Sequence, residues 1–597
     1  MMIAALLTIA VAQTGADAQI LLDRLRLAVA SGTRAKVEEL LVRPDDGTPL
    51  FTMAANRGGL RNLKVAIIPA PAGWTRGVKF WAVLHAAQEI ESETDKVYEV
   101  AYTPNGCKLG SEIPYLFDRP YRIRHQKFAV KLTPEANRVD VRSETQLERI
   151  GGDQSLIVSL GDPYAVSTAK LGGKALKVVQ ATDQKVPVPA DGDLVRAGSL
   201  AIVWGAPNFG DKTTLTLDYS GTINTPADDK ITPSSAVLTA WWAPTIAQLP
   251  FTTEVDIEAP KDWVVRSEGI ATGPSSFKCD VPIAFPKVIG GKYTLAAEKA
   301  VGDKTFRAYQ LGTPDKTRGE IDVAKIARAC EFFEKNLGPF PFPSYEVFDA
   351  DTYYGIESYS YTLLNFRYTT RFVTHEMGHT YFGGLVPCSY LKDTWNEGVT
   401  QYVDSVLLNE NSDRTLETGL RTITIPKPLS RMNIAWADGN ATYMRGAYVM
   451  RMLENEIGLD KVLAGLQAMV KDRVGKETVW ADLRPYFEAA SGQKLDWFWN
   501  QWIHAATFPT VNIASAEVIE REGKYSTVVK ILQKGTVFYR LRFALKLTGP
   551  TGQKVTKVVS MPGQEGEFQV DSDFKPVEAA VDVFGYCLGT PGPPRKL

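Results

Sequence analysis

Two histidines four residues apart constrain this chain more than any other feature of its sequence. His375 and His379 lie in the segment Thr-His-Glu-Met-Gly-His at 374–379, in a chain with only five histidines. In a helix, residues at i and i+4 lie on one face, one turn apart. Two imidazoles placed in this way can hold one ion, and Glu376 after the first histidine completes the His-Glu-x-x-His pattern of zinc hydrolases. The sequence therefore predicts a helix that carries two zinc ligands.

A third ligand is expected from a second helix that begins near Thr394. Glu397 in this helix is the candidate, and three protein ligands on one Zn²⁺ ion would leave the fourth position open, as a catalytic site requires. Glu376 would lie beside the ion, where it could act as a general base on a zinc-activated water molecule. Asp404, about two turns beyond Glu397, is expected to hydrogen-bond a ligand imidazole and so to orient it.

Further motifs carry a resemblance to a known family. The zinc motif is followed by Tyr-Phe-Gly-Gly-Leu-Val at 381–386 and by Trp-Asn-Glu-Gly at 395–398. Together these segments resemble the gluzincin peptidases of the aminopeptidase N and leukotriene hydrolase family. Residues 354–358, Tyr-Gly-Ile-Glu-Ser, are similar to the family's Gly-x-Met-Glu-Asn segment. This resemblance implies that Gly355 and Glu357 bind substrate, with Glu357 holding the free α-amine of a peptide.

The segment Tyr-Met-Arg-Gly at 443–446 resembles the family's Tyr-x-Lys-Gly segment. The resemblance implies that Tyr443 is catalytic and stabilises the tetrahedral intermediate. Three departures accompany these matches. The interval between His379 and Glu397 is one residue shorter than is usual in the family, Tyr354 and Ser358 replace a Gly and an Asn, and Arg445 replaces a Lys. A loop near 386–389 is expected to absorb the missing residue, because in one continuous helix its loss would turn Glu397 away from the histidines by about 100°.

Strand and helix patterns, read with the resemblance, predict a multidomain α+β protein. Residues 119–300 alternate apolar and polar residues in short runs and are expected to form an N-terminal β-sheet domain. Residues 301–508 are expected to be a thermolysin-like, mostly α-helical catalytic domain, in which the strand 361–365 offers an edge for an extended peptide. Residues 509–597 return to strand alternation and are expected to form a C-terminal β-sandwich. Residues 19–118 are an N-terminal extension of unknown role.

The first 18 residues are expected to be a signal peptide, with an apolar run at 3–12 and a small-residue cleavage site at 16–18. The predicted location is therefore secreted or periplasmic. No later apolar run is long enough for a transmembrane helix, so no integral membrane segment is expected after leader removal. The formal net charge of −1 gives no reason to expect nucleic acid as a partner. Five widely spaced cysteines form no disulfide framework or zinc knuckle.

Three functional hypotheses follow from these observations. The favoured hypothesis is a zinc-dependent aminopeptidase that hydrolyses N-terminal residues from a peptide substrate. A second is a zinc endopeptidase, or another amide or epoxide hydrolase, on the same scaffold, which the altered segment around Glu357 favours. The third is a non-catalytic binding protein that has lost zinc through the shortened interval. Glu376 and Tyr443 argue against this last hypothesis, because a binding module needs neither residue.

Overall fold

The computed structural model describes most of residues 121–597 and short segments before them. The earlier segments are 20–25, 27–28, 34–42, 63–69, 80–86, 95–103 and 106–112. Beyond residue 121, the residues outside the description are 150–155, 161–163, 177, 182–193, 198–199, 204–210, 224–228, 240–241, 246–249, 351–354, 366–368, 389–392, 410, 426, 433–440 and 535–537. The predicted signal peptide at 1–18 therefore lies outside the described residues.

The chain divides into two units, each described separately below. The first consists of Met1–Ala297, Ala308–Lys316 and Phe348–Tyr354, and the second of Glu298–Arg307, Thr317–Val347 and Gly355–Leu597. Within the predicted extension, a short helix α2 (Arg34–Glu38) precedes an antiparallel four-stranded sheet in the order β1-β2-β3-β4. Its strands are Leu63–Pro69, Phe80–Ala86, Asp95–Thr103 and Gly106–Glu112.

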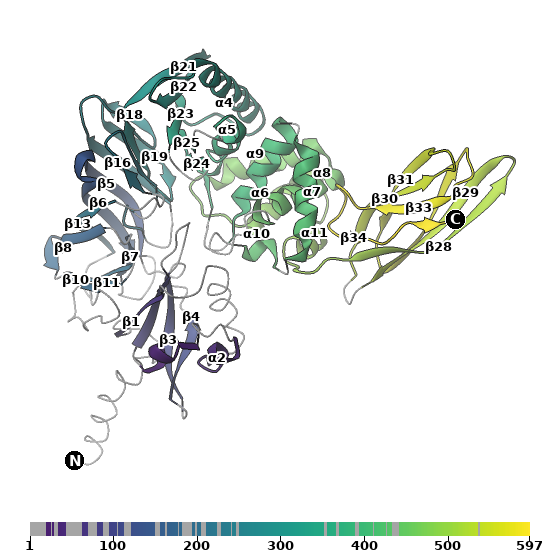
Figure 1. The fold of residues 1–597 in the computed structure, drawn as a ribbon, viewed down its shortest axis with the longest axis horizontal. Helices are drawn as coiled ribbons and strands as arrows, with labels where there is room; N and C mark the ends of the chain where they lie inside the picture. Colours follow the sequence, from purple (N-terminus) through teal and green to yellow (C-terminus); the bar gives the residue numbers. More distant parts are fainter. Residues whose placement is uncertain are drawn as a thin grey trace, which may run out of the picture. The chain divides into compact units, whose positions relative to one another are not determined.

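Three further sheets make up the rest of the first unit's strand-rich part (Figure 1). An eight-stranded sheet has the order β18-β19-β16-β5-β6-β13-β8-β9, with strands Ile270–Gly273, Ser276–Ile283, Phe251–Glu258, Tyr121–Thr133, Arg138–Arg149, Lys212–Thr222, Tyr164–Leu171 and Lys174–Leu176. A four-stranded sheet has the order β14-β15-β20-β17, with strands Lys230–Ile231, Ser235–Leu238, Val288–Gly291 and Val264–Ser267. Another has the order β10-β11-β12-β7, with strands Val178–Ala181, Leu194–Ala197, Leu200–Val203 and Leu156–Ser159.

The core of this unit is built from alternate residues of its strands. In β5, Phe128, Val130 and Leu132 are buried while Lys127, Ala129 and Lys131 are exposed, as expected for a strand with one face covered. Trp242 packs against Phe128 with a ring-centroid distance of 4.8 Å, and its Nε1 donates to the carbonyl of Pro286 at 2.6 Å. The tryptophan is therefore a core residue, with its one polar atom satisfied.

The zinc motif lies in a segment of strands and helices that begins with a five-stranded sheet, ordered β21-β22-β23-β25-β24. Its strands are Tyr293–Val301, Lys304–Leu311, Ser344–Ala350, Tyr361–Asn365 and Gly355–Ser358, and the two-residue strands β26 (Phe382–Gly383) and β27 (Val386–Pro387) form a small pair. The helices are α4 (Lys316–Asn336), α5 (Thr369–Gly378), α6 (Trp395–Gln401), α7 (Ser412–Arg421), α8 (Gly446–Ile457), α9 (Leu459–Arg473), α10 (Trp480–Ser491) and α11 (Asp496–Trp502). Two π-helical turns, η4 (Tyr402–Leu408) and η8 (Ala441–Arg445), join this set.

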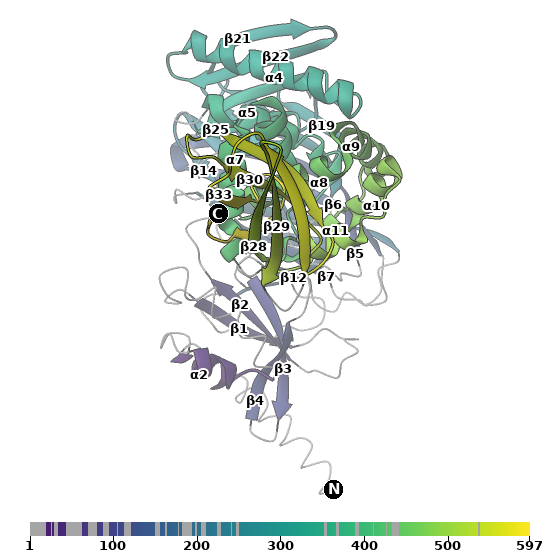
Figure 2. The same cartoon turned by 90° about the vertical axis from the view of Figure 1, so that its right-hand side faces the viewer.

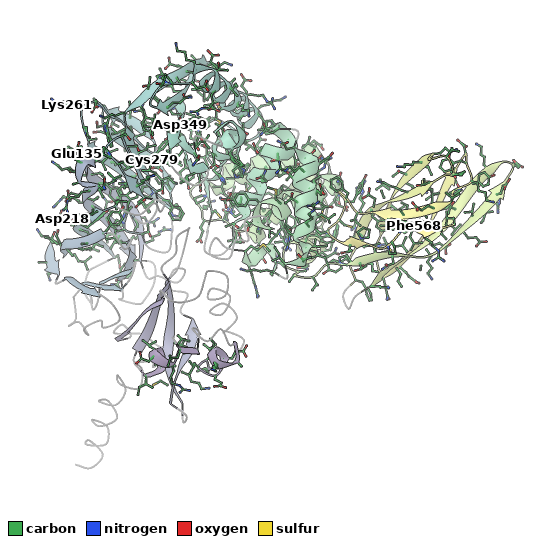
Figure 3. All side chains as sticks on the ribbon, in the orientation of Figure 1. Glu135, Asp218, Lys261, Cys279, Asp349 and Phe568 are labelled. Carbon is green, nitrogen blue, oxygen red and sulfur yellow. The ribbon has the colours of Figure 1, made fainter. Side chains whose placement is uncertain are left out.

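The C-terminal strands form two four-stranded sheets, drawn in yellow and yellow-green in Figures 1 and 2. One has the order β32-β29-β28-β34 and the other β31-β30-β33-β35. Their strands are β28 (Thr510–Arg521), β29 (Lys524–Lys534), β30 (Leu541–Thr548), β31 (Lys554–Met561), β32 (Glu565–Ser572), β33 (Glu578–Asp582), β34 (Thr590–Pro591) and β35 (Arg595–Lys596). Phe543 of one sheet meets Phe568 of the other edge to face, with ring centroids 6.0 Å apart (Phe568 is labelled in Figure 3). Two facing sheets agree with the predicted sandwich, while the predicted domain boundaries stay predictions.

Two expectations from the sequence concern membrane-spanning helices and the pairing of cysteines. None of the helices that the structure describes is both long and apolar enough to cross a membrane. All five cysteines are free and buried. Burial raises the pKa of the Cys388 thiol, which lies near the zinc motif in sequence, and its Sγ donates to the carbonyl of Asp393. The cysteines therefore behave as small core residues.

Candidate metal centre

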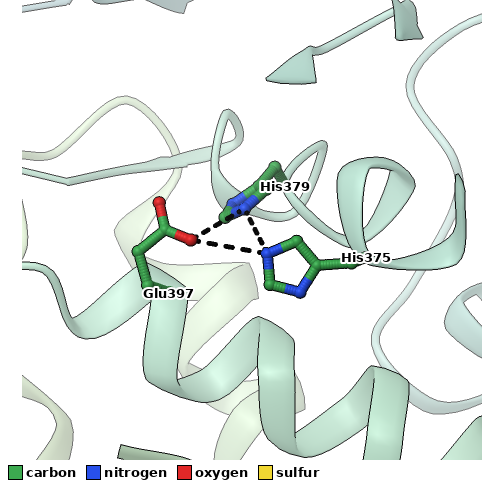
Figure 4. Close-up of side chains that lie close together, drawn as sticks. All are labelled: His375, His379 and Glu397. Carbon is green, nitrogen blue, oxygen red and sulfur yellow. Dashed lines mark hydrogen bonds and ion pairs between the residues drawn. The ribbon is translucent and has the colours of Figure 1, made fainter. Parts of the chain in front are cut away.

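His375, His379 and Glu397 converge on one point (Figure 4). His375 lies in α5, His379 in the turn that follows its last residue, Gly378, and Glu397 in α6. The two imidazole Nε2 atoms are 3.1 Å apart, and the Glu397 Oε2 lies 3.4 Å from His375 Nε2 and 3.2 Å from His379 Nε2. All three side chains are buried. The predicted ligand set is therefore brought together, from two different helical segments.

The described residues between His379 and the start of α6 are not helical. After the turn at 379–381 the chain passes through the short strands β26 and β27. Gly383 in β26 has φ of +119°, a conformation that residues with a Cβ rarely adopt. His379 and Glu397 are therefore not joined by one continuous helix, and α6 presents Glu397 to the histidines. That a loop near 386–389 takes up the missing residue stays a prediction.

The ring of His379 is fixed in the tautomer that a metal ligand needs. Its Nδ1 donates to the backbone carbonyl of Phe382 at 2.9 Å. With the proton on Nδ1, the lone pair of the neutral ring is on Nε2, which faces the other two ligands. The Nδ1 of His375 is buried and has no hydrogen-bond partner within the described part of the chain.

The chemistry of this donor set fits a divalent cation. Glu397 Oε2 is buried, and among the described residues nothing donates a hydrogen bond to it, while Oε1 accepts from Asn396 Nδ2 at 3.3 Å. Burial alone would raise the pKa of Glu397, but the neighbouring imidazoles lower it well below its usual range. Burial lowers the pKa of His379, yet the Glu397 carboxylate raises it more, to about 10. The cluster therefore attracts positive charge, either a proton or a metal ion, and two nitrogens and one carboxylate suit Zn²⁺.

Glu376 is buried beside this cluster, directly against Gly355 of β24. A Cβ atom added to Gly355 would lie 2.8 Å from Glu376 Cδ and closer still to Oε1. Burial raises the pKa of Glu376 to about 7, partly offset by the charges of His375 and His379. A carboxyl with this pKa can take up and release a proton near neutral pH, which is what a general base needs. Gly355 was expected from the resemblance to bind substrate, and the structure adds that it leaves room for Glu376.

Glu357 lies on the same strand as Gly355 and is half-buried. Its negative charge raises the pKa of Glu376 and of His379, which places it within electrostatic reach of the cluster. The expectation that the strand 361–365 offers a free edge is wrong. This strand is β25, which lies between β23 and β24, and the end of the described sheet is β24. The edge strand therefore carries Gly355 and Glu357 themselves.

Tyr443 belongs to the π-helical turn η8 and reaches the cluster through its ring. The ring stacks on the imidazole of His375 with centroids 5.7 Å apart and planes 28° apart. The tyrosine is only half-buried, unlike the three ligands. π-Helical turns occur frequently at functional sites. Tyr443 therefore lies against one of the three converging residues, and its catalytic role stays a prediction.

Asp404 does not make the hydrogen bond expected of it. Its carboxylate accepts from Thr374 Oγ1 and Asn409 Nδ2, and the structure gives it no hydrogen bond to His375 or His379. Asp404 lies in the π-helical turn η4 and faces α5, where it bonds the residue before the first ligand. It therefore acts on α5 through Thr374, the residue before His375.

Two buried residues near the site were not assigned a role from the sequence. Tyr345 of β23 is completely buried, and its pKa is raised by burial and by the charge of Glu376, so it belongs to the surroundings of the base. Arg445 is also completely buried and donates to the carbonyls of Thr422, Ile425 and Lys427. No local sequence pattern marks a buried strand tyrosine. For Arg445, the change from Lys was visible, and its planar group explains the several carbonyl contacts.

Comparison with known proteins gives a consistent set of relatives. No family model matches the chain. It is 28% identical over 168 residues to aminopeptidase N of Lactococcus lactis subsp. lactis, covering 25% of this chain and 19% of the relative. It is 24% identical over 239 residues to aminopeptidase M1 of Arabidopsis thaliana, covering 34% of this chain and 27% of the relative. The chain thus spans under a third of the length of these two curated relatives.

Solved structures show a similar fold. Aminopeptidase A of Legionella pneumophila, in complex with aspartic acid, superposes with a TM-score of 0.62 at 16% identity, over 78% of this chain and 58% of that one. An M1 zinc metallopeptidase of Deinococcus radiodurans superposes with a TM-score of 0.53 at 17% identity, over 66% of this chain and 96% of that one. At these identities the structural likeness concerns the fold.

Proposed function

We propose that the chain is a member of the aminopeptidase N (M1) family and that it is a zinc metallopeptidase that removes residues from the free amino terminus of peptides. The observation that carries this proposal is the convergence of His375, His379 and Glu397 beside the buried carboxyl of Glu376. A metal-binding role alone would not require a buried base with a pKa of about 7 next to the ligands.

The ligands would hold one Zn²⁺ ion through the two Nε2 atoms and Glu397 Oε2. When bound there, the ion would polarise the scissile carbonyl and make a water molecule more acidic. Glu376 takes the proton of the attacking water and returns it to the leaving amine. Its burial against Gly355 keeps the carboxyl dehydrated and its pKa high enough for both transfers.

Tyr443 donates its hydroxyl proton in a hydrogen bond to the oxygen on which negative charge develops. Its ring is already aligned by the stack on His375, so the donor needs little reorganisation during the reaction. Losing such a donor typically costs about 10²- to 10³-fold in rate. Tyr443 thus contributes to the transition state rather than to binding of the ground state.

The edge strand β24 orients the peptide. Its free edge can pair with the main chain of an extended substrate, and Glu357 on the same strand provides a negative charge for the α-ammonium group. When Glu357 holds the α-ammonium group, the peptide bond that lies at the metal cluster is a fixed distance from the free amino terminus. This fixed distance is the basis of aminopeptidase specificity. A second candidate is a zinc endopeptidase, favoured by the altered sequence around Glu357, where Tyr354 and Ser358 replace the family's Gly and Asn. We place either enzyme in a secreted or periplasmic location on the basis of residues 1–18.

The test combines metal analysis with mapping of cleaved bonds. Purified protein is analysed for zinc content and incubated with peptides of mixed sequence, and the products are identified by mass spectrometry. The proposal expects one zinc per chain and stepwise loss of N-terminal residues, abolished in Glu376→Gln with zinc retained. Internal cleavage would identify an endopeptidase. Protein with neither zinc nor cleavage would refute the catalytic proposal and leave a binding protein.

A further inference from the structure

Two glycines bring two helices of the site into backbone contact. Gly398 follows the ligand Glu397 in α6, and Gly446 is the first residue of α8. A Cβ added to Gly446 would lie 2.5 Å from the Cα of Gly398, and a Cβ added to Gly398 would lie 2.8 Å from the Cα of Gly446. Carbon atoms in ordinary contact are about 3.5–4.0 Å apart, so neither position accepts a side chain unless the helices separate by about 1 Å.

Each helix carries a functional group close to this contact. Glu397 is the neighbour of Gly398, and Tyr443 precedes Gly446 by three residues in the π-helical turn that continues into α8. Tyr443 in turn stacks on His375. A change in the separation of the two backbones at Gly398 and Gly446 would therefore change the distance between the carboxylate ligand and the tyrosine.

The helix α8 is held firmly from its other side. The hydroxyl of Tyr448 lies 3.0 Å and 3.1 Å from the carbonyls of Val583 and Cys587, and it accepts from the backbone N–H of Gly585 at 2.9 Å. Asn455, near the end of α8, donates to the carbonyl of Gly585 at 2.6 Å. These bonds join α8 to the turn that follows β33, so a side chain introduced at Gly446 would displace the seven-residue helix α6 more readily than α8.

We propose that Gly398 and Gly446 are positioning residues, whose backbone contact sets the place of the Glu397 carboxylate relative to the two imidazoles and to Tyr443. The part that concerns Tyr443 rests on the proposed function, whereas the part that concerns Glu397 is a statement about metal binding alone. Both glycines are positions in the motifs that carry the family resemblance. The contact explains why each is a glycine in this chain, because a Cβ at either position would overlap the backbone of the other.

The test is Gly446→Ala, with Gly398→Ala as the second variant and Gly465→Ala as the matched control. A Cβ added to Gly465 in α9 would lie 2.5 Å from the ring of Phe487 in α10, so the control introduces an equally close contact, with a side chain instead of backbone, between two other helices. Zinc affinity is measured by competition with a chelator. The visible absorption of the Co²⁺-loaded protein reports the geometry of the ligands, and unfolding in urea reports stability.

We expect Gly446→Ala to fold, to bind Zn²⁺ at least about tenfold more weakly and to change the Co²⁺ spectrum, because a ligand has moved. On peptides, kcat should fall about 100-fold with little change in KM, as for a misplacement of about 1 Å. The control should lose stability with unchanged zinc affinity, Co²⁺ spectrum and kcat.

Three results would overturn the proposal. One is zinc affinity and Co²⁺ spectra in Gly446→Ala and Gly398→Ala that match the control. Another is an equal loss of kcat in the control at equal loss of stability. A third is failure of both variants to fold, which would make the contact a requirement of folding instead of alignment. If the wild-type protein cleaves no peptide, the proposed function fails, while the metal measurements still decide whether the glycines position Glu397.

Discussion

Gly355 and Glu376 pack directly against each other, backbone against carboxyl, although 20 residues separate them in the sequence. One residue lies on an edge strand and the other on the helix that carries the first zinc ligand. Because the glycine has no side chain, the carboxyl can occupy the space beside the metal cluster. This relationship links the strand that would orient a peptide to the group that would move its protons.

Replacing Gly355 by Ala should displace this carboxyl without touching the ligands. A Cβ at position 355 would lie 2.8 Å from Glu376 Cδ, so the side chain must turn away. We expect kcat to fall by about 10²-fold or more, the range for loss of a general base, while the zinc content stays at the wild-type value. Gly563→Ala, where a Cβ meets nothing within 4 Å, is the control and should leave kcat unchanged. Wild-type kcat in Gly355→Ala would show that the carboxyl does not need its present position.

Glu376→Gln should make the metal-free protein more stable at alkaline pH. Burial raises the pKa of Glu376 from 4.5 to about 7, so between these values the folded state binds a proton that the unfolded state has released. The contribution of this group to stability is thus fully present below pH 4.5 and lost as the pH rises through 7. In urea unfolding of chelator-treated protein, the variant should gain on the order of 3 kcal/mol at pH 8 relative to its difference at pH 4.5. A difference that does not change with pH would contradict the raised pKa.

Zinc binding should release a proton from His379. In the metal-free cluster Glu397 holds the pKa of His379 at about 10, so at neutral pH the ring is an imidazolium. Zinc binds only the neutral ring, and its affinity should therefore rise about tenfold for each pH unit between 6 and 8. Calorimetric titrations of Zn²⁺ into the metal-free protein, in buffers of different ionisation enthalpy, would count the released protons. Zinc affinity independent of pH, with no proton release, would disprove this account of the cluster.

Tyr443→Phe should separate transition-state stabilisation from metal binding. The substitution keeps the ring that stacks on His375 and removes only the hydroxyl donor. We expect kcat to fall by about 10²- to 10³-fold, with zinc affinity and KM nearly unchanged. Tyr486→Phe on α10, which loses only a hydroxyl bonded to Asp472, serves as the control. Equal kcat in Tyr443→Phe and the wild type would remove Tyr443 from the mechanism.

The ligand set could be predicted from sequence because its information is local. The i, i+4 spacing places His375 of α5 and His379 of the turn that follows it on one side. The resemblance supplied Glu397 and Tyr443 as motif positions. Strand alternation likewise predicted β5, β13 and β30, since a one-sided sheet imposes a period of two. These expectations depend on residues close together in the chain.

What sequence could not supply depends on the packing of distant segments. Asp404 bonds Thr374 and Asn409 instead of a ligand imidazole, and no local pattern indicated the π-helical turn η4 in which it lies. The order β23-β25-β24 places the fully buried strand β25 inside the described sheet and β24 at its edge. This order depends on which distant strands pair. Gly398 and Gly446 lie in two separate sequence motifs. That each must lack a Cβ becomes clear only from the contact between their helices.

The central claim is that this is an aminopeptidase in which Glu357 recognises the free α-amine. The most direct measurement is the ratio of kcat/KM for a peptide with a free amino terminus to that for the same peptide acetylated, in wild type and in Glu357→Gln. Both proteins must carry equal zinc. We expect a ratio of about 10² in the wild type, which corresponds to about 3 kcal/mol for hydrogen bonds between charged groups, and a much smaller ratio in the variant. Equal rates on both peptides in the wild type would contradict it.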